Sequence, residues 1–282
     1  MSSQRRLPAG KAGRTVRFRD RYLPSIISVT TVIVVFLLLQ QLVVRAEQWP
    51  RIKAQFFSLQ AIIDVFPSVL RGFGINMAVW AVSLLAIALW ALALAIFRSL
   101  HGPWATPLRL FTVIYIDLLR GLPSLLMVLL FGFGIPALQL PGLPRSSLFW
   151  GGVALVLTYS AYAAEVYRSG MEAVHHGQGA AAKALGLSQW QSLRYAILPQ
   201  AIRNVVPSLL NLAVALQKDV ALLSVIGVRD AVREAQIFTA RTFNYSSLIA
   251  AAALFLLATI PMARFTDHVS RKDRERRLQK ML

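Results

Sequence analysis

The sequence predicts an all-α membrane protein with about six transmembrane helices. Hydrophobic residues make up 56% of its 282 residues, and the mean hydropathy is +0.58. These residues gather in long runs, which is typical of a polytopic membrane protein and not of a soluble domain. The formal net charge of +18 would suit nucleic-acid binding in a soluble protein, but in a membrane protein its commoner cause is a cytoplasmic excess of Lys and Arg. Because cysteine is absent, a disulfide framework and a thiolate metal site are excluded.

A basic stretch opens the chain. Residues 1–22 carry repeated Lys and Arg, with Asp20 as the only acidic residue. We expect this stretch to be a cytoplasmic tail that lies against the anionic membrane surface. The first apolar run, residues 26–44, is long enough to cross the membrane, and its length favours an uncleaved anchor over a signal peptide. Charges and aromatic residues mix after it, so residues 23–69 are predicted to be this anchor and an interfacial segment.

Five further apolar runs follow the interfacial segment. They cover residues 75–97, 121–140, 148–164, 205–228 and 246–263. Pro103 and Pro107 fall between the first two of these runs, where we expect them to break any long helix. Residues 70–265 are therefore predicted to form the transmembrane domain, and residues 266–282 a basic cytoplasmic tail.

The distribution of basic residues orients the six predicted spans. An even number of spans places both termini on the same side. If that side is the cytoplasm, roughly 21 Lys and Arg residues lie inside and roughly 8 outside, which satisfies the positive-inside rule; the opposite orientation reverses the excess. The sequence therefore predicts cytoplasmic N and C termini. The polar segment between the fourth and fifth runs, residues 170–199, then lies in the cytoplasm as well.

This polar segment is predicted to form two short helices joined by a tight turn. Residues 180–185 are strong helix formers, and Gly186 follows at the position of a C′ glycine. Ser188 has Gln191 three residues later, which is the capping-box pattern that starts a second helix. Pro199 would cost that helix a backbone hydrogen bond, so we expect the chain to bend there. Such a hairpin is either a simple connector or a contact surface for a partner outside the membrane.

The residues of the hairpin resemble the cytoplasmic EAA loop of ABC importer permeases, in the polar amino-acid uptake branch of that family. The matching strings are RGLP at 120–123, AEVYR at 164–168, GQ at 177–178, AA at 181–182, ALGLS at 184–188, WQ at 190–191, ILPQA at 197–201, KD at 218–219 and SVIGV at 224–228. The resemblance covers roughly residues 70–265 in consistent order. It departs from the family at Ala180, where the family usually has Glu. An ion pair of that Glu with an ATPase is therefore absent here or is supplied by another residue.

The resemblance implies the type I ABC importer permease fold and a multi-pass location in the bacterial inner membrane. It also implies two permease subunits, as a homodimer or with a related permease, two ABC ATPase subunits that bind ATP and Mg, and a periplasmic or extracellular amino-acid binding protein. The chain itself would hold no cofactor and would bind no nucleic acid. The residues that the resemblance assigns to ATPase coupling are Ala180, Ala181, Ala182, Gly186, Leu187, Ser188, Leu198 and Pro199.

No catalytic or metal site is predicted in the chain itself. The sequence contains no G-x-x-x-x-G-K-[ST] phosphate loop, so ATP hydrolysis would have to occur on another subunit. His175 and His176 are neighbours in sequence and point away from one another on a helix, so we expect two solvated side chains and not a metal site.

Ionisable residues inside apolar runs are costly, and they are therefore candidates for the translocation path. Lys218 and Asp219 either fix the packing of two spans or line the path and meet the charged groups of an amino acid. Glu165 either reaches water, pairs with Arg168 or lines the cavity. Arg120 is expected to be an interface anchor or a contact at the inner mouth.

Two rival functions remain open at the level of the sequence. An ATP-independent secondary carrier or channel would use Lys218, Asp219 and Glu165 as an ion relay, but it would not account for the hairpin. A membrane scaffold without transport activity would account for the hydrophobicity alone. The sequence does not identify the amino acid that is carried.

Overall fold

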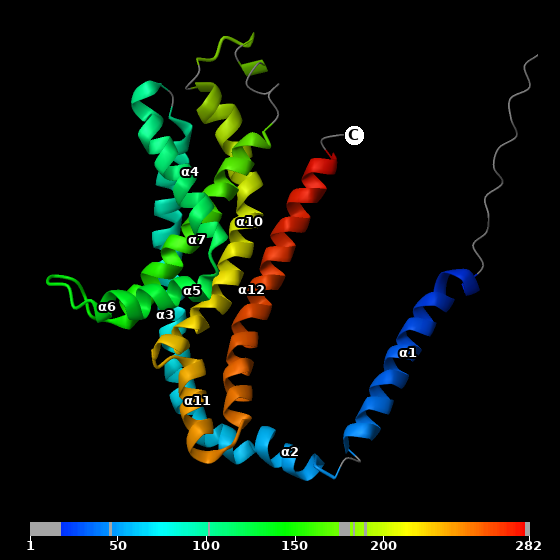
Figure 1. Cartoon of the computed structure of the whole chain (residues 1–282). Helices are drawn as coiled ribbons and strands as arrows, with labels where there is room; N and C mark the ends of the chain where they lie inside the picture. Colours follow the sequence, from blue (N-terminus) through cyan, green and yellow to red (C-terminus); the bar gives the residue numbers. More distant parts are fainter. Residues whose placement is uncertain are drawn as a thin grey trace, which may run out of the picture. The chain divides into compact units, whose positions relative to one another are not determined.

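The computed structural model describes residues 18–44, 47–100, 102–174, 181–182, 184–188 and 191–279. These residues form helices and turns, without a strand among them (Figure 1). The chain divides into two compact units, Met1–Ala54 and Gln55–Leu282. The first unit contains helix α1 (Phe18–Val44), which covers the predicted anchor, and most of the short helix α2 (Trp49–Phe56). Within α1, the stretch Ile26–Gln41 is apolar in composition.

Four helical stretches are long and apolar enough to cross a membrane: Trp49–Ser99, Ser147–Glu172, Leu198–Ile226 and Ser246–Asp273. A fifth candidate is a pair, Pro103–Gly121 and Ser124–Ala137, whose two parts meet at an angle of 103°. The described residues therefore contain four or five candidate spans, where about six were predicted. The predicted run at residues 121–140 is the second part of the bent pair and not a straight span.

Helix α4 (Thr106–Gly121) corrects the expectation that Pro103 and Pro107 break any long helix in this region. Pro103 opens a short 3₁₀ helix, η1 (Pro103–Ala105), and Pro107 lies in the first turn of α4. The first turn has no intrahelical partner for its N–H groups, so a proline there costs no hydrogen bond and its fixed φ favours the helix. The two prolines separate α4 from the helix before it, and they also lie where η1 and α4 begin.

Hydrogen bonds between aromatic side chains hold α4 against its neighbours. The Trp90 indole of α3 (Leu59–Ser99) donates to the Tyr115 hydroxyl at 3.1 Å. That hydroxyl in turn donates to the carbonyl of Leu157 in α7 (Ser147–Glu172) at 2.8 Å. Buried polar groups need such partners. Tyr115 therefore connects α4 with α3 and α7 and fixes the rotation of α4 about its axis.

After α4 the chain turns sharply and forms three short helical pieces. These are α5 (Ser124–Leu129), the π-helix η2 (Leu130–Gly134) and α6 (Ile135–Ala137). Gly132 in η2 is needed for close packing, because a Cβ there would lie 2.5 Å from the Ile226 side chain. Ile226 ends the 3₁₀ helix η4 (Val220–Ile226), which follows α10 (Leu198–Asp219).

A buried polar cluster joins α3 to α11 (Ala231–Thr242). The Asn76 side chain donates to Asp230 at 3.0 Å and to the Val220 carbonyl at 3.3 Å, and it accepts from the Ala231 N–H at 3.1 Å. Asp230 also caps α11 by accepting from the Arg233 N–H at 2.8 Å. Burial raises the pKa of the Asp230 carboxyl above its usual value, although these hydrogen bonds oppose the rise. Asn76 therefore ties helices together, as polar residues within spans commonly do.

One end of the Gln55–Leu282 unit is defined by the starts of α3 and α12 (Ser246–Gln279). The Ser58 N–H, at the beginning of α3, donates to the Ser246 hydroxyl at 2.9 Å. The Phe56 and Tyr245 rings stack beside this contact, with centroids 5.0 Å apart. Helices α3 and α12 therefore start at the same end and both run toward the opposite end (Figure 1).

The opposite end gathers the end of α3, the end of α7 and the start of α10. Arg98, in the last turn of α3, pairs with Glu165 of α7 at 3.4 Å. The Asn204 side chain of α10 donates to the Gly170 carbonyl of α7 at 3.2 Å. The described parts of the polar segment between α7 and α10 lie at this same end, and so do the last turns of α12 (Figure 1).

Much of the apolar surface faces outward. On α3, the side chains of Val82, Leu85 and Leu89 are 68%, 71% and 72% exposed. Their spacing places them along one stripe of the helix. A soluble protein rarely leaves apolar residues exposed in such numbers, so this surface is expected to contact lipid or another membrane subunit. The buried core lies inside, where Leu94, Leu155 and Leu223 pack together.

Candidate functional site

The predicted turn of the polar segment is present. Gly186 has φ +79°, the left-handed conformation of a C′ glycine. The Leu187 N–H donates to the Ala182 carbonyl at 3.1 Å, which is the long hydrogen bond of a Schellman motif. The capping box follows: the Ser188 N–H donates to the Gln191 side chain at 2.9 Å, and the Gln191 N–H donates to the Ser188 hydroxyl at 3.2 Å. Two local motifs thus close the helix before Gly186 and open the next one.

The turn exposes an apolar side chain to solvent. Leu185 is 82% exposed, more than any other large hydrophobic residue among those described. Gly186 and Ser188 are exposed as well, whereas Leu187 is half-buried. A leucine held in this way on a rigid turn is pre-organised to enter a pocket on another protein, because little conformational entropy remains to be lost on binding.

The other predicted coupling residues lie on both sides of this turn. Ala181 is exposed, and Ala182 is only 4% exposed. Leu198 and Pro199 are exposed at the start of α10. Ala180 lies outside the described residues, and so do residues 175–179, 183 and 189–190. The presence of Ala180 where the family usually has Glu therefore has no structural explanation.

The predicted bend at Pro199 takes a different form, because helical structure continues through the proline. The π-helix η3 (Ser192–Ile197) leads directly into α10, which begins at Leu198. A π-helical turn is wider than an α-helical one and shifts the hydrogen-bond register by one residue. The widened turn precedes the proline, whose ring and missing N–H would otherwise disrupt the ladder.

The base of the segment is held by close contact between α7 and α10. A Cβ on the buried Gly170 would lie 2.1 Å from the Val205 side chain. The hydrogen bond from Asn204 to the Gly170 carbonyl lies at the same crossing. A force on the exposed turn would therefore reach both helices, since neither can slide past the other without a clash.

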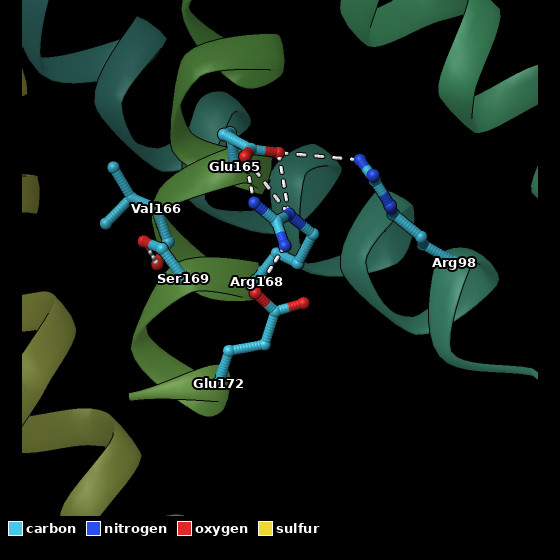
Figure 2. A network of polar contacts seen from close by, with 6 residues as sticks. All are labelled: Arg98, Glu165, Val166, Arg168, Ser169 and Glu172. Atoms are coloured by element: carbon cyan, nitrogen blue, oxygen red, sulfur yellow. Dashed lines mark hydrogen bonds and ion pairs between the residues drawn. The ribbon is translucent and has the colours of Figure 1, made fainter. Parts of the chain in front are cut away.

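Glu165 belongs to an ion-pair cluster near this end of α7 (Figure 2). Arg168 donates through its Nε to the Glu165 carboxylate at 3.0 Å and also pairs with Glu172. Arg98 of α3 approaches the other side of Glu165 at 3.4 Å. Of the alternatives for Glu165, the structure contains the pair with Arg168, three residues later on the same helix face. The contribution of Arg98 comes from a distant part of the chain.

Lys218 and Asp219 do not pair with one another. Lys218 is exposed on α10, and it forms no ion pair with any carboxylate in the described part of the chain. Asp219 is half-buried and accepts a hydrogen bond from the Tyr159 hydroxyl of α7 at 3.0 Å. The two charges therefore have separate surroundings, as expected for neighbours on a helix.

Buried Gln217 explains why Lys218 points outward. Gln217 is fully buried, and its side-chain oxygen accepts from the Thr259 hydroxyl of α12 at 2.5 Å. This hydrogen bond sets the rotation of α10 against α12. The next residue along the helix is turned by about 100°, so Lys218 lies off the buried face. The sequence does not single out Gln217, because an amide beside two charged residues carries no distinct signal.

Arg120 lies in the last turn of α4, next to the sharp bend that follows this helix. Its guanidinium lies 5.8 Å from the centre of the Tyr162 ring, and the Tyr162 hydroxyl donates to its backbone carbonyl at 3.4 Å. The Tyr162 ring in turn lies 6.2 Å from that of Tyr159, the partner of Asp219. The two tyrosines thus connect Arg120 with Asp219.

No group of three or more potential metal ligands occurs among the described residues. His175 and His176 lie outside them. The arrangement has two parts: an exposed hairpin turn at one end, and a set of polar side chains within the spans. Such an arrangement is chemically suited to contact with a partner protein at the turn and with a charged solute at the polar side chains.

The chain has clear relatives of known family. Residues 104–275 match the family model described as binding-protein-dependent transport system inner membrane component. The probable amino-acid ABC transporter permease protein YckA of Bacillus subtilis (strain 168) is 32% identical over 225 residues, which cover 80% of this chain and 95% of the relative. The arginine transport system permease protein ArtQ of the same organism is 31% identical over 214 residues, covering 75% of this chain and 95% of the relative.

Solved structures show the same fold. The crystal structure of an amino acid ABC transporter with histidines aligns with a TM-score of 0.69 at 29% identity, covering 76% of this chain and 98% of that chain. The inward-facing MetNI methionine ABC transporter aligns with a TM-score of 0.57, covering 73% of this chain and 95% of that chain. At 16% identity the second match is a likeness of fold alone.

Proposed function

We propose that the chain forms the import path for a polar amino acid. This proposal proceeds from its family: the chain belongs to the binding-protein-dependent transport system inner membrane components. It is thus a membrane permease subunit of an ABC transporter. Members of this family work with ATPase subunits and binding proteins. The amino-acid substrate is supported by the names of the relatives. The observation that carries the coupling role is the exposed Leu185 on a turn held by a Schellman motif and a capping box. The rival carrier is not favoured by these relatives.

The orientation that we propose places the hairpin and both termini in the cytoplasm, with the protein in a bacterial inner membrane. The hairpin and the last turns of α12 already share one end of the Gln55–Leu282 unit. The excess of Lys and Arg favours the cytoplasm for that end. On this side the turn is within reach of the ATPase subunits, which would bind ATP and Mg.

In the proposed mechanism, the turn around Gly186 sits in a groove on an ATPase subunit and moves with it. Two permease subunits, either identical or related, enclose the path, and a periplasmic or extracellular binding protein delivers the amino acid. The contact of Gly170 with Val205 passes the movement of the turn to α7 and α10 together. ATP can drive this change only if the ATPase interacts differently with the inward-facing and outward-facing states.

We place the charged groups of the amino acid near Lys218, Asp219 and Arg120. Lys218 is an exposed cation within the candidate span Leu198–Ile226. A cation in that position needs water or an anionic group, because an exposed charge in hydrocarbon is costly. A path lined by Lys218 supplies both, as water when it is empty and as the carboxylate of the amino acid when it is occupied. We assign Glu165 a structural part, which is supported by its ion pairs with Arg98 and Arg168.

Replacing Leu185 by Asp is expected to abolish co-purification of the ATPase subunits. The substitution places a charge where a partner would bury an apolar side chain, and it removes little packing inside the permease because Leu185 is 82% exposed. The measurement is a pull-down of the tagged complex from detergent-solubilised membranes, followed by an assay of ATPase activity. Leu138→Asp is the matched control, because Leu138 is 65% exposed in a different loop. An ATPase that is retained equally by both variants would contradict the coupling role.

Replacing Lys218 by Met is expected to lower uptake by at least about tenfold, since a charge-assisted hydrogen bond is typically worth about 1.5–3 kcal/mol. Methionine keeps most of the length and the apolar stem but removes the charge. The loss should appear in uptake into vesicles with ATP trapped inside, while ATPase subunits still co-purify. Wild-type uptake by this variant would remove Lys218 from the path. Uptake that stops on collapse of the proton gradient, and not on ATP depletion, would support the carrier instead.

A further inference from the structure

A groove of about 370 Å³ lies between the first turns of α10 and the last turns of α12. Its apolar lining includes Ile202 and Val206 from α10 and Phe265 from α12. Ile202 is 51% exposed and Phe265 is 60% exposed. The groove therefore presents apolar side chains to whatever surrounds this side of the protein.

The polar lining of the same groove is mainly basic. Arg203 comes from α10, while His268, Lys272 and Asp273 come from α12. Arg203, His268 and Lys272 are exposed. The two permanent cations outnumber the single carboxylate, and His268 adds a hydrogen-bonding group, so the electrostatic field of the groove favours an anion.

The groove lies where both helices pass from apolar to charged sequence. Residues 246–263 of α12 carry no charge and extend over about 27 Å, close to the thickness of the hydrocarbon core of a bilayer, about 30 Å. Charged residues begin at Arg264 and continue to the end of the helix. On α10, Arg203 is the last charged residue before Lys218. Phe265 therefore lies at the edge of the hydrocarbon, and Lys272 lies about 10 Å farther out, at the level of the headgroups.

We propose that this groove binds an anionic phospholipid from the leaflet on the side of the hairpin, which is the cytoplasmic leaflet in the orientation proposed above. The lipid phosphate lies between Arg203 and Lys272, and an acyl chain lies along Ile202, Val206 and Phe265. Basic pockets between spans at the cytoplasmic surface are suited to such headgroups. A free phosphate ion would satisfy the cations but would leave the apolar lining uncovered. A phospholipid carries its negative charge at the required height and leaves both cations in contact with the headgroup layer.

The test compares two double variants of the intact transporter complex in nanodiscs of phosphatidylethanolamine with a minor share of phosphatidylglycerol. Arg203→Gln with Lys272→Gln removes the two cations of the groove. Arg264→Gln with Arg271→Gln removes equal charge from exposed positions of α12 that do not line it. Native mass spectrometry measures the phosphatidylglycerol that stays bound. We expect about thirty-fold weaker retention in the first variant, because each basic residue near an anionic surface contributes about fivefold, and retention close to wild type in the second.

Two further measurements separate the possible occupants. A benzoylphenylalanine in place of Phe265 is expected to form an adduct with lipid after illumination, and added inorganic phosphate is expected not to displace the retained phosphatidylglycerol. An adduct with α1 or with a second permease subunit would overturn the proposal, as would displacement by inorganic phosphate. Equal retention by both double variants, or an equal loss from both, would overturn it as well. Co-purification of the ATPase subunits with each variant verifies that the complex is intact.

Discussion

Replacing Gly186 by Val is expected to lower ATP-driven uptake about tenfold while the permease still assembles in the membrane. Gly186 has φ +79°, and no other heavy atom lies within 4 Å of the position that a Cβ would take. The effect is therefore one of backbone conformation and not of steric clash. The left-handed region costs an L-residue roughly 1–2 kcal/mol, and a β-branched residue pays at least as much. That cost lowers the population of the turn conformation that presents Leu185 by about tenfold.

The matched control for this variant is Gly142→Val. Gly142 has nearly the same conformation, φ +81°, and also has open space around it, but it lies in the loop after α6. Both variants carry the same local strain, so only a role of the turn in coupling separates them. The measurements are uptake into vesicles and the stimulation of ATPase activity by the binding protein. Gly186→Asn should retain more uptake than Gly186→Val, because Asn tolerates the left-handed region. Normal coupling in Gly186→Val would contradict the role of this turn in coupling to the ATPase.

Replacing Gly72 by Val is expected to destabilise the Gln55–Leu282 unit severely, by about 3 kcal/mol or more. A Cβ on Gly72 would lie 2.4 Å from the backbone carbon of Asp230 and 2.6 Å from the backbone nitrogen of Ala231. A backbone cannot rotate out of the way as a side chain can. The start of α11 would have to move, and its movement would break the buried contacts between Asn76 and Asp230.

Gly74→Val on the same helix is the matched control. Gly74 is exposed, and no heavy atom lies within 4 Å of the position that its Cβ would take. Both variants add a β-branched residue to α3, so the propensity cost is shared and cancels in the comparison. The midpoint of thermal unfolding in detergent and the yield of monodisperse protein are the measurements. If the two variants unfold at the same temperature, α3 and α11 do not pack as closely as the structure has them.

The hairpin could be predicted from sequence because its determinants are local. Leu187, Ser188 and Gln191 make their hydrogen bonds within three to five residues, so spacing alone specifies the partners. The apolar runs of α3, α7, α10 and α12 were likewise visible, since a span needs about 20 apolar residues in succession. Family membership followed from the order of the motifs.

The course of the chain around Arg120 and Pro199 could not be predicted in the same way. The effect of a proline depends on its place within a helical turn. Pro107 lies in the first turn of α4, and Pro199 follows a π-helical turn at the start of α10. The amphipathic helix α4 carries Arg109 and Asp117, so its sequence resembles a loop more than a span. Its helical structure depends on packing against α3 and α7 through Tyr115.

By itself, the sequence determined the helical membrane class, the capped hairpin turn and the presence of costly charges inside apolar runs, because each rests on composition or on contacts between near neighbours. Tertiary structure alone decided the partners of those charges. Arg98 reaches Glu165 from another helix, Asn76 meets Asp230 across more than half of the chain, and buried Gln217 turns its neighbour Lys218 outward. Distant pairings of this kind depend on the rotation and crossing of whole helices, and a periodic apolar pattern leaves that rotation open.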